Sequence, residues 1–116
     1  MRILMAVMVA ALLAGCASST MDDARARAPS KILSSAKAEQ LVAQCVQFAW
    51  QDEAVFGVDA AAYLEPGKNG GYTVYARSAE SFVDIKSEAA RTSALFYAVE
   101  DNFVSKRRLA ALATCL

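Results

Sequence analysis

The chain has 116 residues, of which 56% are hydrophobic and 21% are charged, and its 12 Lys and Arg residues balance its 12 Asp and Glu residues. This length predicts a single domain. The chain contains no histidine, which excludes Ser-His-Asp and Cys-His catalytic sites and histidine metal sites. The balanced charge argues against a nucleic-acid binder, which requires a basic surface.

The first 15 residues have the layout of a secretory signal peptide. One positive charge, at Arg2, precedes an apolar run from Ile3 to Leu13, and small residues follow the run. The run is shorter than the roughly 20 apolar residues that a membrane-spanning helix needs. A buried core helix is the alternative, which the position of the run directly after a Met-Arg start disfavours. We therefore expect residues 1–15 to be a processing segment and not part of the fold.

The end of this run, Leu13-Ala14-Gly15-Cys16, resembles the lipobox of bacterial lipoproteins. In that class the Cys is diacylated on sulfur, the signal peptide is cut just before it, and the new amino group is acylated. The resemblance implies that Cys16 is the lipidated first residue of the mature protein, held at the membrane by several acyl chains, as stable anchoring requires. An Asp after the Cys tends to retain Gram-negative members in the inner membrane. This chain has Ala17, which implies the outer membrane.

The segment after the lipobox reads as a tether. Residues 17–30 are mostly small and polar and show no apolar periodicity. The sequence therefore predicts a lipidated Cys and flexible tether over residues 16–31 and a single folded domain over residues 32–116.

Two further cysteines, Cys45 and Cys115, predict one structural disulfide. The folded part of a lipoprotein faces an oxidising compartment, where paired cysteines usually join. A redox site is the alternative, but it would favour a Cys-x-x-Cys spacing that the chain lacks.

Apolar periodicity predicts a first helix over residues 34–51, capped by a serine hydroxyl. Its expected buried stripe contains Leu41, Cys45 and Phe48. Alternating residues then predict short strands, separated by turns, over residues 60–64, 72–77, 81–86 and 92–100. A helix is the alternative for the last of these segments, because it is rich in alanine.

The turn between the first two strands, residues 66–71, could be misread as a phosphate loop. It lacks the Gly-Lys-Ser/Thr ending, and the following residues favour a strand and not a helix. A hairpin turn is therefore predicted.

A second helix is predicted over residues 101–115, with acids at its start and the basic run Lys106-Arg107-Arg108 further along. We expect this run to form a solvated helix face, with anionic lipid headgroups as the functional alternative. The predicted fold class is α+β: an N-terminal helix, a three- or four-stranded antiparallel meander and a C-terminal helix. The disulfide would hold both helices on one face of the sheet.

Alternation along the strands places aromatic side chains on the face of the sheet away from the helices. If the aliphatic residues of these strands face the helices, then Tyr75, Phe82 and Phe96 lie on the opposite face, among mixed charges. Aromatic residues in such a setting suit a surface that binds a protein partner. The alternative is that another segment, such as residues 52–60, covers this face.

The carboxylate pairs Asp52-Glu53 and Glu80 with Asp84 are the main candidates for catalysis. A catalytic pair needs a cleft and one acid with a raised pKa. Neighbouring acids of this kind are usually solvated, so we expect no catalytic residue. We also expect no metal site and no cofactor.

The chain also loosely resembles small proteobacterial and prophage envelope lipoproteins of unassigned function. The expected function is a non-enzymatic binding or structural role at the periplasmic face of the outer membrane, with a protein partner and no nucleic acid. One alternative is a phage-type exclusion or inhibitor lipoprotein that blocks an envelope receptor or enzyme. A second alternative is a hydrolase of envelope polymers, which a deep pocket with a buried carboxylate would favour.

Overall fold

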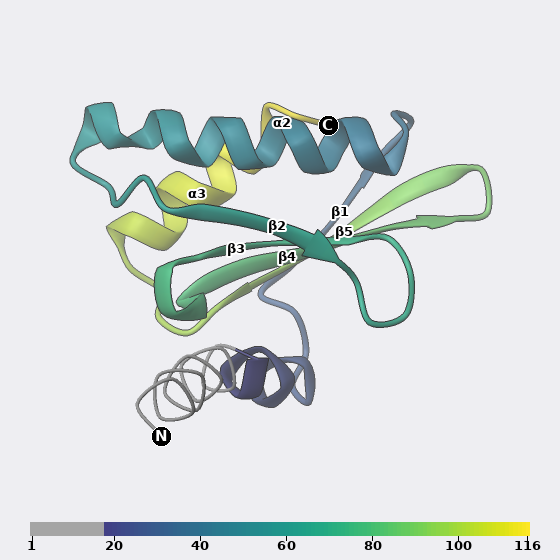
Figure 1. Ribbon diagram of the computed structural model, residues 1–116, viewed down its shortest axis with the longest axis horizontal. Coiled ribbons are helices and arrows are strands. Elements are labelled where there is room, and N and C mark those ends of the chain that lie inside the picture. The colour runs from purple at the N-terminus through teal and green to yellow at the C-terminus, as the bar shows by residue number, and fades with distance from the viewer. Residues whose placement is uncertain (1–17) are drawn as a thin grey trace, which may run out of the picture.

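The computed structural model describes residues 18–116. Within these residues the fold is α+β, with a five-stranded antiparallel sheet in the order β1-β5-β4-β3-β2 (Figure 1). The predicted fold class is confirmed, although the sheet has five strands and not three or four. The predicted signal peptide and Cys16 lie outside the described residues.

Four strands form the predicted meander, and one strand was not expected. The bounds are β1 (Lys31–Ser35), β2 (Ala62–Pro66), β3 (Tyr72–Ala76), β4 (Ser81–Glu88) and β5 (Arg91–Ala98). Strand β1 pairs antiparallel with β5 at the edge of the sheet. Its residues were predicted to form the end of the tether and the cap of the first helix. The sequence of β1 ends in two serines that suit a helix cap equally well, and its pairing with the distant β5 decides its structure.

The turn between β2 and β3 is a hairpin, as predicted. The N–H of Gly67 donates to the carbonyl of Gly71 at 2.9 Å. Gly71 has a φ of 68°, and a Cβ there would lie 2.1 Å from the carbonyl oxygen of Ile85. Only glycine fits this position without a shift of the backbone.

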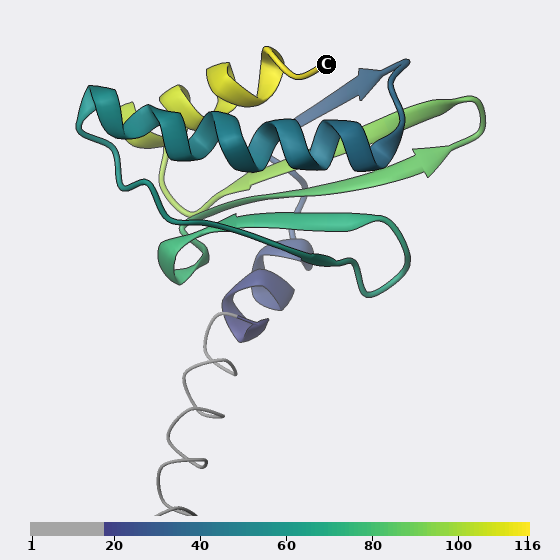
Figure 2. The same ribbon diagram turned by 45° about the horizontal axis from the view of Figure 1, so that its top comes forward.

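Two long helices, α2 (Glu39–Asp52) and α3 (Phe103–Ala113), cover one face of the sheet, as predicted (Figures 1 and 2). Helix α3 begins with a capping box: the Asn102 side chain accepts from the N–H of Ser105, whose hydroxyl accepts from the N–H of Asn102. Helix α2 begins after Ala38 without a side-chain cap. The predicted serine cap is wrong, because Ser35 closes the preceding turn by accepting from the N–H of Lys37.

Two short 3-10 helices follow α2 and β3. The first, η1 (Glu53–Phe56), continues from the end of α2 and stops at Gly57, whose φ is 78°. The second, η2 (Arg77–Ala79), connects β3 to β4. Both lie at the end of the sheet from which α3 begins.

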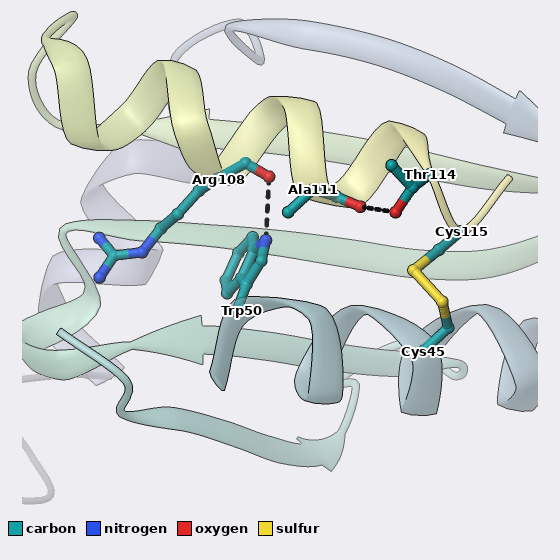
Figure 3. The surroundings of a disulfide bond; sticks show 6 residues. All are labelled: Cys45, Trp50, Arg108, Ala111, Thr114 and Cys115. Atoms are coloured by element: carbon teal, nitrogen blue, oxygen red, sulfur yellow. Dashed lines mark hydrogen bonds between the residues drawn. A yellow bond between two sulfur atoms is a disulfide. The ribbon is translucent and has the colours of Figure 1, made fainter. Parts of the chain in front are cut away.

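The main core lies between the sheet and the two long helices. Trp50 of α2 is buried there and packs edge to face against Phe96 of β5, with ring centres 6.5 Å apart. Its indole N–H donates to the carbonyl of Arg108 at 2.9 Å (Figure 3). The predicted disulfide is confirmed: Cys45 and Cys115 are joined, with Cα atoms 5.7 Å apart. The bond ties the end of α3 to the middle of α2.

The buried stripe of α2 differs from the predicted one. The buried residues are Val42, Ala43, Val46 and Trp50, whereas Leu41 and Phe48 are 61% and 62% exposed. Cys45 is also exposed, on the flank of the helix that reaches α3. Both sets have helical spacing and apolar character, so periodicity could not distinguish them.

The described part of the predicted tether is not an extended linker. Residues 18–25 are helical and lie on the face of the sheet opposite α2 and α3 (Figures 1 and 2). Met21 of this N-terminal helix is 3% exposed and packs into a second apolar cluster with Phe82 and Tyr97. The short segment carries one large buried residue, which is too weak a local pattern to predict its docking on the sheet.

Candidate interaction surfaces

The aromatic face predicted from the sequence is only partly assembled. In the pairing of β4 with β5, Phe82 lies opposite Tyr97 and Val83 lies opposite Phe96. Residues directly opposite in an antiparallel pair point to the same face. Phe96 therefore faces the helices, and Tyr97 occupies the position on the opposite face that was predicted for Phe96. The prediction for Phe96 is wrong because both faces of β5 are apolar and alternation alone does not distinguish them.

The N-terminal helix covers the centre of this face. Phe82 and Tyr97 stack with ring centres 4.7 Å apart, and Phe82 is 1% exposed beneath Met21 and its neighbours. The predicted alternative was that another segment, such as residues 52–60, covers this face. The covering segment is instead residues 18–25, so Phe82 is not available to a partner in this structure.

A polar network holds the N-terminal helix on the sheet. The Nε and Nη2 atoms of Arg25 each donate to the carboxylate of Asp84 at 2.7 Å, and Nη2 also donates to the Thr73 hydroxyl at 3.2 Å. The Thr73 hydroxyl donates in turn to Asp84 at 2.7 Å. The hydrogen bonds to Asp84 raise the pKa of Arg25. Such a two-pronged contact fixes the position of the helix as well as stabilising it.

Sequence reasoning did not identify Arg25. Its guanidinium lies 5.0 Å from the centre of the Phe82 ring, which adds a cation–π contact to the network. The signal that could have indicated a docked helix is the spacing of Met21, Ala24 and Arg25, which places them on one helical face.

A second ion pair on this side is exposed. Lys68 donates to both carboxylate oxygens of Asp22 at 2.7 Å, and this contact lowers the pKa of Asp22. Exposed pairs contribute little to stability because water solvates the separated charges well.

Two tyrosines remain accessible at the edge of the aromatic face. Tyr63 of β2 lies beside Tyr75 of β3, with ring centres 5.1 Å apart. Tyr75 is half-buried, and burial is the main cause of its raised pKa. Of the predicted partner residues, Tyr75 alone is partly exposed on the predicted face.

Exposed apolar side chains lie along the side of α2 that points away from the sheet and continue into η1. Leu41, Phe48 and Val55 are all exposed and follow one another at intervals of seven residues, and Phe56 is exposed beside them. Seven residues are nearly two helical turns, so Leu41 and Phe48 lie on one line along α2. The position of Phe56 is supported by the guanidinium of Arg107, 4.0 Å from its ring centre.

Glu53 and Glu80, two of the acids considered for catalysis, pair with arginines of α3. Buried Glu53 accepts from Arg107 at 2.8 and 2.9 Å, and Glu80 accepts from the buried Arg108. The prediction of a solvated basic run is therefore wrong for Arg108, because its side chain is buried and donates to Glu80.

A third acid considered for catalysis, Asp84, is held by Arg25 on the opposite side of the sheet, and the fourth, Asp52, is exposed at the end of α2. A surface hollow of ≈ 260 Å³ includes Glu80, Ser81 and Arg108 in its lining. Within residues 18–116, no group of three or more Cys, Asp or Glu residues is arranged to hold a metal ion. Glu53, Glu80 and Asp84 are thus each paired with an arginine.

No family model matches this chain, and neither a curated protein nor a solved structure gives a match. Over the described residues, no helix combines the length and apolar character needed to cross a membrane.

Proposed function

We propose that this protein is a small lipid-anchored envelope protein that binds another protein through the outward side of α2 and catalyses no reaction. The observation that carries the proposal is the exposure of Leu41 and Phe48 on one side of α2, followed by exposed Val55 in η1. Contiguous large apolar side chains are costly on a soluble surface and mark sites of interaction. The periplasmic face of the outer membrane is the proposed location.

The position of the N-terminal helix supports a division of the molecule into an anchored side and a binding side. The lipobox resemblance assigns the acyl chains to Cys16, two positions before the described helix begins. That helix packs on the face of the sheet opposite α2 (Figure 2). The anchor would therefore attach on the side away from Leu41 and Phe48 and leave them accessible.

The ion pairs support a binding role over the hydrolase alternative. Glycoside hydrolysis needs two carboxyl groups that face the same substrate, whereas Glu53, Glu80 and Asp84 are each engaged by a different arginine of the protein.

Replacement of the proposed lipidated residue tests the anchor. In Cys16→Ser, expressed as the full chain in a Gram-negative bacterium, we expect no incorporation of labelled fatty acid and a precursor of unchanged length. Cleavage before residue 16 with continued acyl labelling would contradict the proposed anchor.

A photo-reactive amino acid at position 48 tests the binding side. In intact cells we expect ultraviolet light to join the full chain to a protein through position 48. The matched control is position 32, since Ile32 of β1 is 67% exposed and lies away from α2. Equal adduct formation at both positions, or none at position 48, would contradict the proposed role of α2.

A further inference from the structure

We propose that the end of the domain where β5 joins α3 rests on the lipid bilayer that holds the anchor, with Val99 and Phe103 inserted at the level of the lipid headgroups. The inference rests on the proposed anchor at Cys16 and adds the orientation of the domain on the membrane. The surface concerned, called here the membrane end, consists of the exposed side chains of Val99 and Phe103.

The proposed anchor leaves little chain between the membrane and the fold. Cys16 lies two positions before the described helix of residues 18–25 begins. Two residues span at most about 7 Å even when they are fully extended. While residues 18–25 are docked on the sheet, the start of this helix is therefore held at the membrane surface.

The start of the N-terminal helix lies beside the membrane end. Thr20 and Val99 line the same surface hollow of ≈ 260 Å³, and both also line a neighbouring hollow of ≈ 180 Å³. Thr20 is only four positions after Cys16. The lipid anchor and the exposed Val99 are therefore brought to the same end of the molecule.

Both apolar residues of the membrane end are exposed on a backbone that is held in place. Val99 is 59% exposed and Phe103 is 63% exposed. The N–H of Val99 donates to the carbonyl of Glu80 at 3.0 Å, and Phe103 is the first residue of α3, directly after the capping residue Asn102. Because the backbone is already ordered, insertion of these side chains gains from the removal of apolar surface from water at little cost in conformational entropy.

The charges around the membrane end favour apolar insertion over attraction to anionic lipid. Glu100 and Asp101 are exposed between Val99 and Phe103, and Lys106 is exposed further along α3. Two acids and one base offer no net attraction to anionic headgroups. The proposed contact is therefore expected on a zwitterionic bilayer, whose headgroups carry no net charge.

This orientation keeps the start of α2 away from the bilayer. Helix α2 begins at the end of the sheet opposite to the start of α3 (Figure 1), where the Thr92 hydroxyl donates to the carbonyl of Lys37 at 2.6 Å. Strand β5 runs from there towards Val99 over eight residues, which is about 25 Å. Leu41, near the start of α2, therefore remains open to a protein partner.

Tryptophan fluorescence in vesicles tests the orientation. The full chain is expressed with its own N-terminus, purified in a mild detergent and placed in vesicles of phosphatidylcholine whose acyl chains are brominated close to the headgroup. Bromine quenches tryptophan only at short range. We expect Phe103→Trp to lose at least about half of the emission that it adds, relative to vesicles of ordinary phosphatidylcholine, because inserted side chains lie about 5–10 Å deep.

The matched control is Leu41→Trp. Leu41 is 61% exposed, almost as much as Phe103, but it lies at the opposite end of the molecule, so its emission should be retained. The unmodified chain provides the contribution of Trp50, which is 1% exposed and is common to all variants. Val99→Trp is a second probe of the membrane end, is expected to be quenched like Phe103→Trp, and keeps the test valid if one variant fails to fold.

Three outcomes would overturn the inference, and they separate it from the proposed function. Retained emission at positions 99, 103 and 41 would contradict the membrane end, while the binding role of α2 would stand. Quenching at position 41 equal to or stronger than that at position 103 would place the outward side of α2 on the bilayer and contradict both proposals. Failure of the full chain to enter the vesicles would contradict the anchor itself, and the inference with it.

Discussion

The two faces of the sheet are covered in different ways. On one face, α2 and α3 bury a continuous apolar layer and are joined to each other by the Cys45–Cys115 disulfide. On the other face, residues 18–25 bury a small cluster around Met21 and are fixed by the contact of Arg25 with Asp84. Buried apolar area and a covalent link hold α2 and α3 on the sheet, whereas a few polar contacts position the N-terminal helix.

This difference predicts where stability resides. Burial of apolar surface stabilises roughly in proportion to its area, whereas a partly exposed ion pair competes with water for the same groups. Substitutions between the sheet and the long helices should therefore affect global unfolding, and substitutions under the N-terminal helix should chiefly affect local docking. The following predictions test that contrast, from the largest expected effect to the smallest.

Loss of the disulfide should have the largest effect. The bond closes a loop with a sequence separation of 70, so Cys45→Ser combined with Cys115→Ser should lower the free energy of unfolding by about 4 kcal/mol. Urea unfolding of the full chain in detergent measures the change, with the reduced unmodified chain as the control that should behave alike. A loss below about 1 kcal/mol would show that the disulfide is not important for the helical cover.

A matched pair of leucines tests which side of the helical layer is core. Leu112 of α3 is fully buried, so Leu112→Ala should destabilise by about 3 kcal/mol. Leu41→Ala on the outward side of α2 should change stability by no more than about 0.5 kcal/mol. Thermal and urea unfolding provide both values. Similar losses for the two variants would mean that Leu41 belongs to the core after all.

Removal of Arg25 should release the N-terminal helix while the rest of the fold persists. Arg25→Met leaves Asp84 and Thr73 without their guanidinium partner, and we expect a loss of about 1–2 kcal/mol in docking of residues 18–25. Hydrogen exchange of these residues reports the docking directly. Lys68→Met removes the exposed pair with Asp22 and is the control, with at most about 0.5 kcal/mol expected. Equal exchange in the two variants would argue against Arg25 as the residue that holds the helix.

The burial of Tyr97 beneath the N-terminal helix should also make the free energy of unfolding depend on pH in the alkaline range. Burial first, and the charge of Asp84 second, raise the pKa of Tyr97 above the ordinary value of about 10. Because the pKa of Tyr97 is higher in the folded state, the unfolded chain releases this proton at a lower pH than the folded chain does. The contribution of neutral Tyr97 to the free energy of unfolding is therefore complete below pH 10 and is lost as the pH rises through the folded-state pKa. Urea unfolding at pH 9 and pH 11 should show a smaller alkaline loss in Tyr97→Phe than in the unmodified chain. An identical loss would mean that the N-terminal helix does not shield this residue from water.

Local patterns in the sequence determined much of the structure. Helical periodicity placed α2 and α3, alternation and turn residues placed β2 to β5, and the pairing of Cys45 with Cys115 followed from their number and the expected compartment. These features depend on residues close together in the chain or on simple counting, so they can be recognised without knowing the fold. The proposed lipid anchor at Cys16 was likewise read from four adjacent residues.

The tertiary structure alone decided which faces are buried. Helix α2 is apolar both at Val42 and Val46 and at Leu41 and Phe48, and packing against the sheet selected the first set. Strand β5 is apolar on both sides. A shift of one residue in the assignment of its faces puts Tyr97 and not Phe96 on the face away from the long helices. The strand β1 and the docking of the N-terminal helix depend on contacts across long separations, such as the 59 positions between Arg25 and Asp84. No local pattern encodes such contacts, because the free energy that forms them exists only once the sheet is in place.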